Sequence, residues 1–595
     1  MLDIIDQKAA AAAEAWLQQA IDALSAVDRN AVESLFSAES YWRDVLALTW
    51  GLETTLGRER IGDALCIRAP AAGLNDLKVE ISPLPPRHVV RVGTETIEAF
   101  FTFSTNVGRG RGIVRLCADE SEDGQYKAWT LLTALEELTG FEERTGRKRP
   151  TGESHSRDFR GPNWQDQLNQ TRAYADRDPA VIVVGGGHAG LAIAARLGHL
   201  GVDTLVVDKE DRIGDNWRLR YHALTLHNQV QVNHMPYMPF PPGWPTYIPK
   251  DKLANWFEVY VDALELNFWT STEFLGGTYD HSEQVWEITL GCADGSKRTM
   301  RPQHVVMATG VSGIANRPDI STLEQFAGSV VHSSEYEDGE DWSGKRAIVI
   351  GTGNSGHDIA QDLASSGADV TIVQRNPTLI VNIEPSAQLP YSLYEEGPAL
   401  EECDFITLSM PTPLGRKAHT SFTRRARELD KALLDGLESI GFRLDFGEDD
   451  TGWQFKYLTR GGGYYFNVGC SDMLVAGAIR LCQFDQIDHF SPKGACLKDG
   501  ETLSADLVVL ATGYMPQEYL IKKLFGEKIA RRVGPIWGFG DGQELRAMYA
   551  RTDQPGLWFI AGSLAQCRIN SKYLALQIKA CEEGLLSTSR AAVIQ

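Results

Sequence analysis

The sequence predicts an α/β protein in which one strand–glycine turn–helix–strand unit occurs twice, after an N-terminal α+β unit. Two observations carry this prediction. Short β-branched runs lead into glycine-rich turns at Gly185–Gly190 and again at Gly351–Gly356, and each turn opens a helical pattern. The first 145 residues instead start with Ala-rich helical sequence and continue into strand-like runs. At about 150 residues per domain, the 595 residues allow about four units.

The composition excludes several classes of function. The 79 acidic residues outnumber the 58 basic ones and give a net charge of −21, whereas nucleic acids and anionic membranes bind positively charged surfaces. The nine cysteines include no CxxC pair, so neither a zinc knuckle nor a dithiol redox pair is indicated. The N-terminus lacks the features of a signal peptide, and no run of ~18 apolar residues occurs. We expect a cytoplasmic protein without metal, nucleic acid or membrane partners.

Residues 1–145 are interpreted as one α+β unit. A helix over Ala9–Ala23 and a short second helix through Phe36, which starts near Asp28, are predicted first. Alternation of polar and apolar residues then predicts a curved antiparallel sheet with the helices on one side. The expected strands are Leu77–Ile81, His88–Val92, Thr96–Phe103, Gly112–Leu116 and Lys127–Leu135.

Residues 146–178 are expected to be a linker. The stretch from Glu142 to Trp164 is polar, rich in basic residues and interrupted by Pro and Gly. Such mixed-charge stretches are usually solvated, and we expect this one to lie over the neighbouring domain.

The first repeated unit has the features of a dinucleotide-binding turn. The strand Ala180–Val184 is followed by Gly185, Gly187 and Gly190. The first glycine permits a tight turn, the second lets the backbone approach a pyrophosphate, and the third lets the helix pack on the strand. Asp208 ends the next strand about 20 residues later, where an acid accepts hydrogen bonds from a ribose and repels a 2′-phosphate. This unit therefore suits FAD.

The second unit repeats the pattern with a different ending. The strand Arg346–Ile350 leads into Gly351, Gly353 and Gly356, but Arg375 stands where the first unit has its acid. A guanidinium at this position binds a 2′-phosphate, so the unit is predicted to bind NADPH. The predicted architecture is two Rossmann-like dinucleotide-binding domains after an α+β domain: an FAD domain over residues 179–342 and 505–595, and an NADP domain with an insertion over residues 343–504.

Further motifs resemble those of class B flavin-dependent monooxygenases, the flavin-containing monooxygenase family. Phe326–Tyr336 is similar to the family signature FxGxxxHxxx(Y/F), and the motifs agree in order and spacing over roughly residues 179–585. The plant auxin-biosynthetic and microbial members look closest. Baeyer–Villiger monooxygenases have Trp where Tyr336 stands, so the chain resembles the heteroatom-oxygenating branch more. The other matching pieces are Gly214–Trp217, Ala308–Gly310, Gly351–Gly356 and Ala511–Tyr514.

The resemblance implies a mechanism and a set of site residues. In the family, NADPH reduces FAD, O₂ adds to give a flavin C4a-(hydro)peroxide, and retained NADP⁺ shields this species until a small organic substrate arrives. Asn228 matches the asparagine that contacts flavin and NADP⁺ and is the expected catalytic residue, with Asn233 as its competitor. The other implied cofactor contacts are His227, Asn216 and Trp217 toward FAD and Asn354, Ser355, Gly356 and Asp358 toward NADP.

Three other signals in the matching region concern the framework. His332 is expected to hold the crossover between the domains rather than to transfer protons. Thr309 and Thr512, each in an Ala-Thr-Gly segment after a strand, are expected to mark where the chain passes between domains. The polar start of the C-terminal helix is expected to approach the flavin through Gln566, Asn570 and Ser571.

The N-terminal unit resembles the SnoaL-like (nuclear transport factor two-like) cone. The resemblance rests on the order of helices, the segment Tyr41–Asp44 and the long curved strands. Such cones can host a catalytic Asp/His pair, but no histidine precedes His88, and Asp44 is the one residue placed for a pocket. We expect a structural, dimerising or lid role, with a homodimer as the protein partner.

Three functions from different classes stay open. The first is an NADPH- and O₂-dependent monooxygenase that performs N- or S-oxygenation or oxidative decarboxylation of a keto acid, with Baeyer–Villiger oxygenation of a ketone as its alternative. The second is an NADPH oxidase or flavin reductase that releases H₂O₂, because Glu337 and Gln231 stand where the family has basic residues. The third is a binding module with a degenerate flavin half, against which the intact glycines, Asp208 and Arg375 argue.

The substrate has no motif of its own in this sequence. Pro236–Pro249 and the insertion Ile383–Tyr464 are rich in Pro, Gly and aromatic residues and are expected to shape the entrance. This composition suits an apolar or aromatic small molecule. Amine, sulfide, keto acid and ketone remain alternatives.

Overall fold

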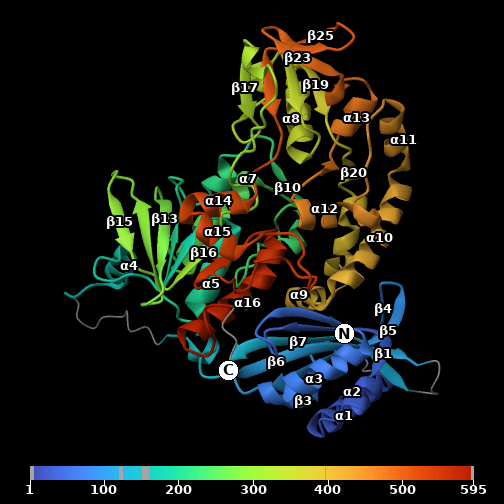
Figure 1. The fold of residues 1–595 in the computed structure, drawn as a ribbon, viewed down its shortest axis with the longest axis vertical. Helices are drawn as coiled ribbons and strands as arrows, with labels where there is room; N and C mark the ends of the chain where they lie inside the picture. The colour runs from blue at the N-terminus through green and yellow to red at the C-terminus, as the bar shows by residue number, and fades with distance from the viewer. Residues whose placement is uncertain (1–5, 120–124, 151–159, 396, 591–595) are drawn as a thin grey trace.

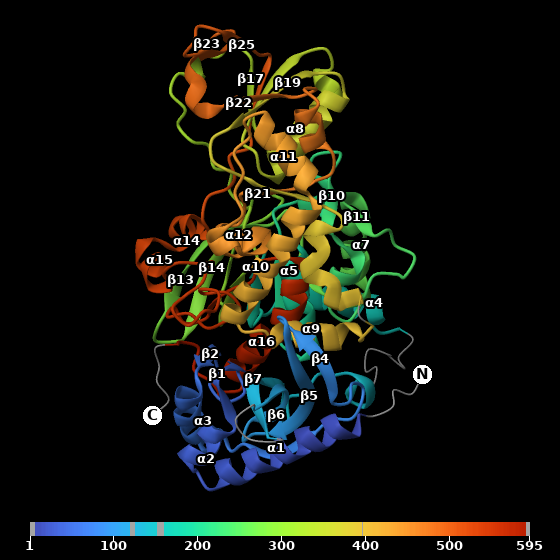
Figure 2. The same ribbon diagram turned by 90° about the vertical axis from the view of Figure 1, so that its right-hand side faces the viewer.

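The computed structural model describes residues 6–119, 125–150, 160–395 and 397–590. Three units follow one another along the long axis of the molecule: the N-terminal unit, a unit built on a first parallel sheet and a unit built on a second parallel sheet (Figure 1 and Figure 2). Among the described helices, none is long and apolar enough to cross a membrane.

The N-terminal unit is a seven-stranded sheet with helices on one face (Figure 1). Its main path runs β2-β1-β7-β6-β5-β3, and β4 pairs with β5. Asp6 and Asp28 cap the first two helices by accepting backbone N–H bonds, and Trp16 is buried. The elements are α1 (Gln7–Ser25), α2 (Arg29–Ser34), β1 (Phe36–Val45), β2 (Leu52–Leu56), α3 (Arg58–Ala72), β3 (Asn75–Val79), β4 (Arg87–Arg91), β5 (Thr94–Ser104), β6 (Gly108–Ala118) and β7 (Tyr126–Leu138).

Two strands of this sheet differ from the sequence prediction. Phe36, the expected end of a helix, begins β1, and neither β1 nor β2 is among the strands that the alternation predicts. β1 lies parallel to β7, with Trp42 opposite Leu131, so the sheet is not entirely antiparallel. This pairing joins segments that are far apart in the chain, which a local pattern of polar and apolar residues does not encode.

The first parallel sheet has the strand order β12-β9-β8-β16-β27. β8 and β9 are buried along their full length, as expected for β-branched strands that are covered on both faces. Their register pairs Val181 with Thr204 and Val184 with Val207. The elements are β8 (Val181–Val184), α5 (His188–His199), β9 (Thr204–Val207), α6 (Asp215–Arg218), α7 (Lys250–Ala263), β12 (Asn267–Trp269), β16 (His304–Met307), β27 (Leu557–Phe559) and α16 (Leu564–Glu582).

Smaller elements surround this sheet. The predicted linker contains a helix, α4 (Trp164–Ala173), which Asn163 caps, while its residues 151–159 lie outside the described part of the chain. An antiparallel three-stranded sheet packs against α14 through Phe274 and Phe525, whose ring centroids are 5.6 Å apart. The elements are β10 (Thr225–Gln229), β11 (Tyr247–Pro249), β13 (Glu273–Asp280), β14 (Val285–Gly291), β15 (Lys297–Met300), α14 (Gln517–Phe525) and α15 (Glu527–Val533).

The second parallel sheet has the order β17-β26-β18-β19-β22 and extends beyond the predicted NADP segment at both ends. β17 and β26 lie outside residues 343–504, yet they pair with each other, and β26 pairs with β18. The predicted boundaries at residues 342 and 505 therefore need correction. The elements are β17 (Ser329–His332), β18 (Arg346–Ile350), α8 (Asn354–Ser365), β19 (Asp369–Gln374), α13 (Cys470–Val475), β22 (Arg480–Gln483), β23 (Ile487–Ser491), β24 (Gly494–Leu497), β25 (Thr502–Ser504) and β26 (Leu507–Leu510).

The insertion between β19 and β22 is mainly helical. It begins and ends in two short parallel strands, in which Leu379 pairs with Tyr464 and Asn382 with Asn467. Its helices descend from the second sheet toward the N-terminal unit (Figure 1 and Figure 2). The elements are β20 (Leu379–Asn382), the 3₁₀ segment η5 (Ser386–Glu395), α9 (Leu400–Leu408), α10 (Thr412–Leu429), α11 (Lys431–Ser439), α12 (Gly452–Arg460) and β21 (Tyr464–Asn467).

The face of the N-terminal sheet opposite its helices is covered by α9 and α16 (Figure 1). Arg43 of β1 donates two hydrogen bonds to the carboxylate of Glu544, at 2.9 and 2.7 Å, and a third to the carbonyl of Leu408. Arg115 of β6, which is fully buried, donates to the hydroxyl of Ser409 at 2.8 Å. The N-terminal unit is thus joined to the insertion and to the first unit by charged groups, of which Arg115 is fully buried and the pair Arg43–Glu544 half-buried.

Candidate active site

The first glycine turn is built so that helix and turn approach each other closely. A Cβ at Gly185 would lie 2.6 Å from the carbonyl oxygen of Ala308, and one at Gly190 would lie 1.9 Å from the carbonyl oxygen of Gly185. Gly187 is the N-cap of α5 and supplies no side chain to the helix. The first N–H groups of α5 therefore have no side-chain cap and are available to an anion such as a pyrophosphate.

The second glycine turn repeats this geometry. A Cβ at Gly351 would lie 2.2 Å from the carbonyl oxygen of Ala511, and one at Gly356 would lie 2.0 Å from that of Gly351. Gly353 caps α8 without a side chain, and a Cβ there would meet nothing nearer than 3.8 Å. The start of α8 is therefore a second uncapped helix terminus, beside space that a phosphate can fill.

The residues predicted to contact FAD gather around the first turn. Asp208 directly follows β9, and one of its carboxylate oxygens accepts the backbone N–H of Gly186 at 2.6 Å. The side-chain amide of Asn216 lies 2.6 Å from the position of a Cβ on Gly187. Trp217 is half-buried, with its ring centroid 6.1 Å from that of His188.

The residues predicted to contact NADP lie at two ends of the α8 region. Asn354 begins α8 and accepts the backbone N–H of Phe466 at 3.0 Å, and Ser355 beside it is half-buried. Arg375 directly follows β19, at the position that Asp208 occupies after β9. Its exposed guanidinium has no hydrogen bond or ion pair with any residue in the described part of the chain. It is therefore free to bind a phosphate.

Asp358 lies at the junction of the two units rather than at the surface of the second. The hydroxyl of Tyr221 donates to its carboxylate at 2.5 Å, and Nε2 of His227 lies 3.8 Å away. Burial raises the pKa of Asp358, while His227 and Tyr221 oppose that rise. Because Tyr221 and His227 precede the second sheet and Asp358 belongs to α8, this cluster links the two units.

A cavity of about 210 Å³ lies where the units meet. The first residue of α5, His188, and the first residue of α8, Asn354, both line it, as does Ser563, the capping residue of α16. Three helix starts therefore converge on one space. The other described residues that line it are Trp217, Leu226, His227, Asn228, Asn233, Tyr391, Trp453, Gln454, Tyr457, Tyr464, Phe466, Gly562, Leu564 and Gln566.

Both candidates for the catalytic asparagine line this cavity. The side-chain amide of Asn228 donates to the hydroxyl of Tyr391 at 3.2 Å. The amide of Asn233, which is almost completely buried, donates to the backbone carbonyl of Asn228 at 2.8 Å. Asn228 therefore keeps an oxygen and an N–H for a ligand, whereas Asn233 holds the strand that carries it.

Several lining residues were not identified from the sequence individually. The insertion supplies Tyr391, Trp453, Gln454, Tyr457 and Tyr464, so its aromatic composition was the available signal. Trp453, Gln454 and Tyr457 all belong to α12. Their spacings of one and three residues bring them to one side of that helix.

Other predicted contacts lie outside the cavity. No residue of Pro236–Pro249 lines it; Phe240 and Trp244 of that segment stack on each other instead, with centroids 4.7 Å apart. At the start of α16 only Gln566 of the three predicted residues lines the cavity. Asn570 donates to the backbone of Gln566, and Ser571 donates to that of Arg568.

His332 joins two crossing segments. Its Nε2 lies 3.0 Å from the carbonyl oxygen of Gly513, in the turn after β26, and its Nδ1 lies 2.8 Å from the hydroxyl of Ser334. The ring is fully buried and does not line the cavity. These contacts support the expected role of His332 in holding the crossover over a role in proton transfer.

Asp44, the residue singled out in the N-terminal unit, has its carboxylate occupied. It accepts hydrogen bonds from the backbone N–H groups of Leu48 and Thr49 and from the hydroxyls of Thr49 and Thr133. Burial raises the pKa of Asp44 to about 6, although these bonds act in the opposite direction. The residue organises a loop and does not reach the cavity.

The residues present fit two dinucleotide cofactors. Two uncapped helix starts are available for pyrophosphates, an acid follows β9 and a free guanidinium follows β19. None of the nine cysteines, all of which lie in the described part of the chain, forms a disulfide, and none of them lines the cavity. The site therefore provides what FAD and NADPH need.

Comparisons with known proteins agree with this geometry. The family Pyridine nucleotide-disulphide oxidoreductase matches residues 182–395. The chain is 31% identical over 343 residues to indole-3-pyruvate monooxygenase YUCCA1 of Oryza sativa subsp. japonica, which covers 56% of this chain and 77% of that protein. It is 32% identical over 357 residues to the probable indole-3-pyruvate monooxygenase YUCCA10 of Arabidopsis thaliana, and this match covers 58% of this chain and 86% of that protein.

The fold also resembles a solved structure of the same architecture. The open crystal structure of cyclohexanone monooxygenase superposes with a TM-score of 0.51 at 19% identity, covering 68% of this chain and 88% of that one. This likeness concerns the fold. The sequence relatives, with which the two cofactor cradles agree, place the chain in the class B flavin-dependent monooxygenase family, whose FAD-, NADPH- and O₂-dependent oxygenation it shares.

Proposed function

We propose that the enzyme transfers one oxygen atom of O₂ to a small keto acid or ketone, next to its carbonyl carbon. One observation carries this proposal: a single cavity contains the first residues of both cofactor-binding helices, His188 and Asn354, together with Asn228. Electrons from a nicotinamide can then reach O₂ beside a bound substrate. The relatives named above act on indole-3-pyruvate, which is a keto acid, and a ketone presents the same carbonyl group.

The reaction balances for both substrate classes. A keto acid with O₂, NADPH and H⁺ gives CO₂, an acid shorter by one carbon, NADP⁺ and water. A ketone with the same reagents gives an ester, NADP⁺ and water. FAD, when bound, supplies the transfer of electrons from NADPH to O₂.

The chain's part in cofactor binding is assigned to the two cradles. The unit of the first sheet would hold FAD through the uncapped start of α5, with Asp208 accepting from a ribose. The unit of the second sheet would hold NADPH through the start of α8, with Arg375 at the 2′-phosphate. The remaining proposed contacts are Gly185, Gly187, Gly190, Asn216, Trp217 and His227 for FAD, and Gly351, Gly353, Asn354, Ser355, Gly356 and Asp358 for NADPH.

Asn228 is the proposed catalytic residue. The Tyr391 hydroxyl orients its amide, and Asn233 fixes its backbone. An amide in this position can donate one hydrogen bond to an oxygen atom of the reacting groups and accept another without changing its charge. It thereby orients the reactants over a wide pH range.

The insertion is proposed to keep water away from the reacting atoms. Its aromatic side chains Tyr391, Trp453, Tyr457 and Tyr464, with Phe466 of β21, form an apolar wall of the cavity. Excluding water favours oxygen transfer over release of H₂O₂.

The N-terminal unit is proposed to be a SnoaL-like cone with a structural role. Its support is the sheet with helices on one face and the carboxylate of Asp44, which is fully used within the unit. The opposite face of the sheet covers α9 and α16, as a lid would. A homodimer and a cytoplasmic location stay predictions from the sequence.

Oxygen transfer is tested with purified FAD-loaded enzyme, NADPH and ¹⁸O₂ on a panel of keto acids and ketones. We expect NADPH-dependent product that carries one ¹⁸O atom, with little H₂O₂. If every substrate leaves H₂O₂ as the sole product of O₂, the chain is an NADPH oxidase and the proposal is wrong.

A further inference from the structure

The cavity carries no positive side chain of its own. Among the described residues that line it, none is Lys or Arg. His188 is half-buried, desolvation lowers its pKa, and its Nε2 lies 2.8 Å from the carbonyl oxygen of Gly562. His227 lies 3.8 Å from the carboxylate of Asp358, so any charge on it has an internal partner. A carboxylate in this cavity would find no free cation from the protein.

The buried arginine next to the cavity is already fully engaged. Arg568 of α16 donates to both carboxylate oxygens of Asp404, at 2.7 and 2.6 Å. It also donates to the backbone carbonyls of Val232 and His234, at 2.8 and 2.7 Å, on either side of Asn233. Releasing this guanidinium toward a substrate would leave the largely buried carboxylate of Asp404 without its cation, with the Tyr394 hydroxyl at 2.8 Å as its remaining partner.

The three helix starts do not replace a cation for the substrate. On the proposed function, the starts of α5 and α8 hold the pyrophosphates of FAD and NADPH, which are anionic. The start of α16 is closed by a capping box, in which Ser563 and Gln566 exchange hydrogen bonds. Their positive ends are therefore used before a substrate binds.

The cavity offers a flat aromatic surface instead. The ring of Trp453 stands perpendicular to that of Phe466, with centroids 4.8 Å apart, and 5.8 Å from that of Tyr464. Tyr391 lies 5.9 Å from Trp453. Rings in edge-to-face contact leave faces and edges on which another ring can pack.

Two buried polar atoms of the cavity have no hydrogen-bond partner among the described residues, Nδ1 of His188 and the side-chain oxygen of Gln454. Buried amides are nearly always bonded, so that of Gln454 is expected to bond a ligand. Its oxygen can only accept. The group that can bond a carbonyl oxygen is its NH₂ group, which supplies two donors and has no partner among the described residues.

We propose that the substrate is an uncharged ketone carrying an aromatic or cyclic apolar group, which packs on the wall of Tyr391, Trp453 and Phe466 while the Gln454 amide bonds its carbonyl oxygen. This inference rests on the proposed function, because it selects one of its two substrate classes. The selection follows from charge: a keto acid would bury a carboxylate without a cation.

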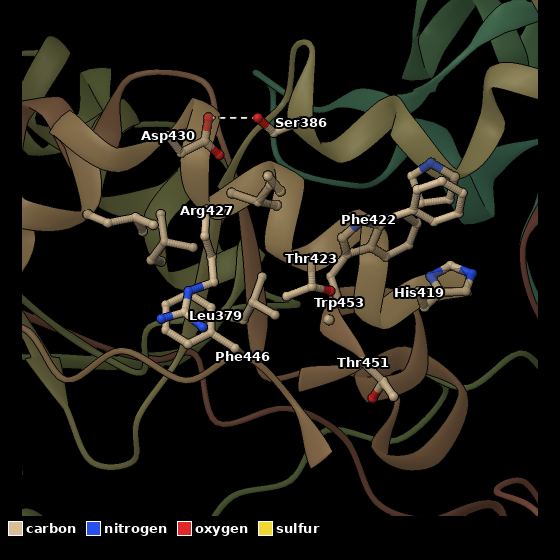
Figure 3. A pocket seen from close by; sticks show the side chains of 16 residues that line it. Leu379, Ser386, His419, Phe422, Thr423, Arg427, Asp430, Phe446, Thr451 and Trp453 are labelled. Carbon is tan, nitrogen blue, oxygen red and sulfur yellow. Dashed lines mark hydrogen bonds between the residues drawn. The ribbon is translucent and has the colours of Figure 1, made fainter. Parts of the chain in front are cut away.

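Trp453 also sets the depth of the cavity. Its other side lines a second, narrower cavity of about 20 Å³ between η5, α10 and α12, where Phe422 and Thr423 lie nearby (Figure 3). The carboxylate of Asp430 in that second cavity accepts from the hydroxyl of Ser386 at 2.7 Å and from Asn382, so it is occupied. Trp453 is thus a wall between two spaces, and the structure assigns to it the size limit for the substrate.

The substrate class is tested with a matched pair, phenylacetone and phenylpyruvate, which differ by a methyl group in place of a carboxylate. With FAD-loaded enzyme, NADPH and ¹⁸O₂, we expect benzyl acetate from phenylacetone and a kcat/KM for phenylpyruvate lower by about 100-fold or more. Titration of the flavin absorption spectrum provides a binding readout that does not depend on turnover.

The outcomes separate the inference from the proposed function. Conversion of phenylpyruvate to phenylacetate at a kcat/KM equal to or above that of phenylacetone overturns the uncharged substrate and leaves the proposed function standing. If neither is oxygenated and all O₂ appears as H₂O₂, both fail.

Two variants test Gln454. Gln454→Arg places a cation in the cavity, and we expect the ratio of kcat/KM for phenylpyruvate to that for phenylacetone to rise about 10-fold or more. Gln454→Met keeps the size without polar atoms; it should raise KM for phenylacetone about 10-fold and leave phenylpyruvate unimproved. An unchanged ratio in the arginine variant, with full flavin content, argues against the assignment.

Trp453→Ala tests the size limit. Joining the two cavities should raise kcat/KM for 4-phenylcyclohexanone relative to phenylacetone by about 10-fold, since space is what limits the larger ketone. Phe422→Ala is the matched control because Phe422 lines the second cavity and not the first, so it should leave this ratio unchanged. Equal effects of both variants would contradict the role of Trp453.

Discussion

Asn228 is the residue on which oxygen transfer is expected to depend most directly. Asn228→Ala removes the amide that Tyr391 orients, so we expect the product formed per NADPH to fall about 10-fold or more while H₂O₂ rises. Tyr391→Phe removes one orienting bond and should give a smaller loss in the same direction. Both are measured as the ratio of product to H₂O₂ at saturating NADPH. Unchanged coupling in Asn228→Ala would exclude a catalytic role.

Arg375 is expected to decide between the two nicotinamide cofactors. Its guanidinium is exposed and unpaired among the described residues, so its removal disturbs no internal contact. Arg375→Ala should raise KM for NADPH about 10- to 100-fold and leave KM for NADH unchanged, because only NADPH carries a 2′-phosphate. Equal losses for both cofactors in initial-rate assays would show that Arg375 does not recognise that phosphate.

The sequence identifies some residues of the candidate site individually and misses others. Asp208 and Arg375 are predictable because each directly follows the strand after a glycine turn, so their place in the fold follows from their place in the chain. Gln454 has no such marker. It reaches the cavity because the insertion folds back over the first unit, and the distance between α12 and β10 is set by tertiary packing alone.

At the scale of elements, the docking of α8 should make stability depend on pH. His357 of α8 is fully buried, stacks on the ring of Tyr465 at 4.1 Å, and has its pKa lowered to about 4 by burial. The unfolded chain takes up a proton near pH 6.5 and the folded one does not, so stability is lost as the pH falls. From pH 8 to pH 5 this loss is about 2 kcal/mol.

The measurement compares urea unfolding of wild type and His357→Phe at both pH values. The variant should lose less stability between them, since Phe cannot take up a proton. His419, which burial also shifts to a pKa of about 4, remains in both proteins and cancels in the comparison. An identical pH dependence for the two proteins would show that His357 is not the group responsible.

The repeated strand–turn–helix units are the elements that sequence reasoning locates best, because each strand, turn and helix lies within about 25 adjacent residues. β17 and β26 show the limit of locating elements from the local sequence pattern. Each is a short apolar strand that could join either parallel sheet, and the pairing of Val331 with Val509 decides that they extend the second. β1 is a similar case, because its partner β7 comes much later in the chain.

At the scale of the whole molecule, the stability of the contact between the N-terminal sheet and the rest of the chain should depend on the buried charges in that contact. Arg115 is fully buried and paired with Glu98. Burial alone would raise the pKa of the Glu98 carboxyl, but the positive charges of Arg115 and Arg91 outweigh this effect and lower the pKa to about 2. Arg115→Met removes one of the three guanidinium groups that hold the buried carboxylate of Glu98, leaving those of Arg87 and Arg91, and should lower the free energy of unfolding by about 1–3 kcal/mol.

Lys417→Ala is the matched control at the same contact. Lys417 and Glu39 form an exposed pair, so its loss should cost about 1 kcal/mol or less. Thermal unfolding of the two variants measures the difference. Equal losses would mean that the contact is held by its apolar part, in which the rings of Phe100 and Phe405 stack at 6.2 Å.

The attachment of the insertion has a consequence for domain motion. Although the insertion interrupts the second sheet in sequence, Arg43 bonds its backbone at Leu408, and Asp404 of α9 is paired with Arg568 of α16. It is therefore anchored to the half of the molecule that holds the first sheet. Its helix α11 also packs in one core with α8 and the second sheet, and Gln374 of β19 exchanges two hydrogen bonds with the backbone of Arg443. The insertion thus fastens the two halves to each other, and a rotation of the second sheet would strain the segment that carries the aromatic wall. Exchange of the electron donor and the shape of the substrate space are therefore mechanically coupled.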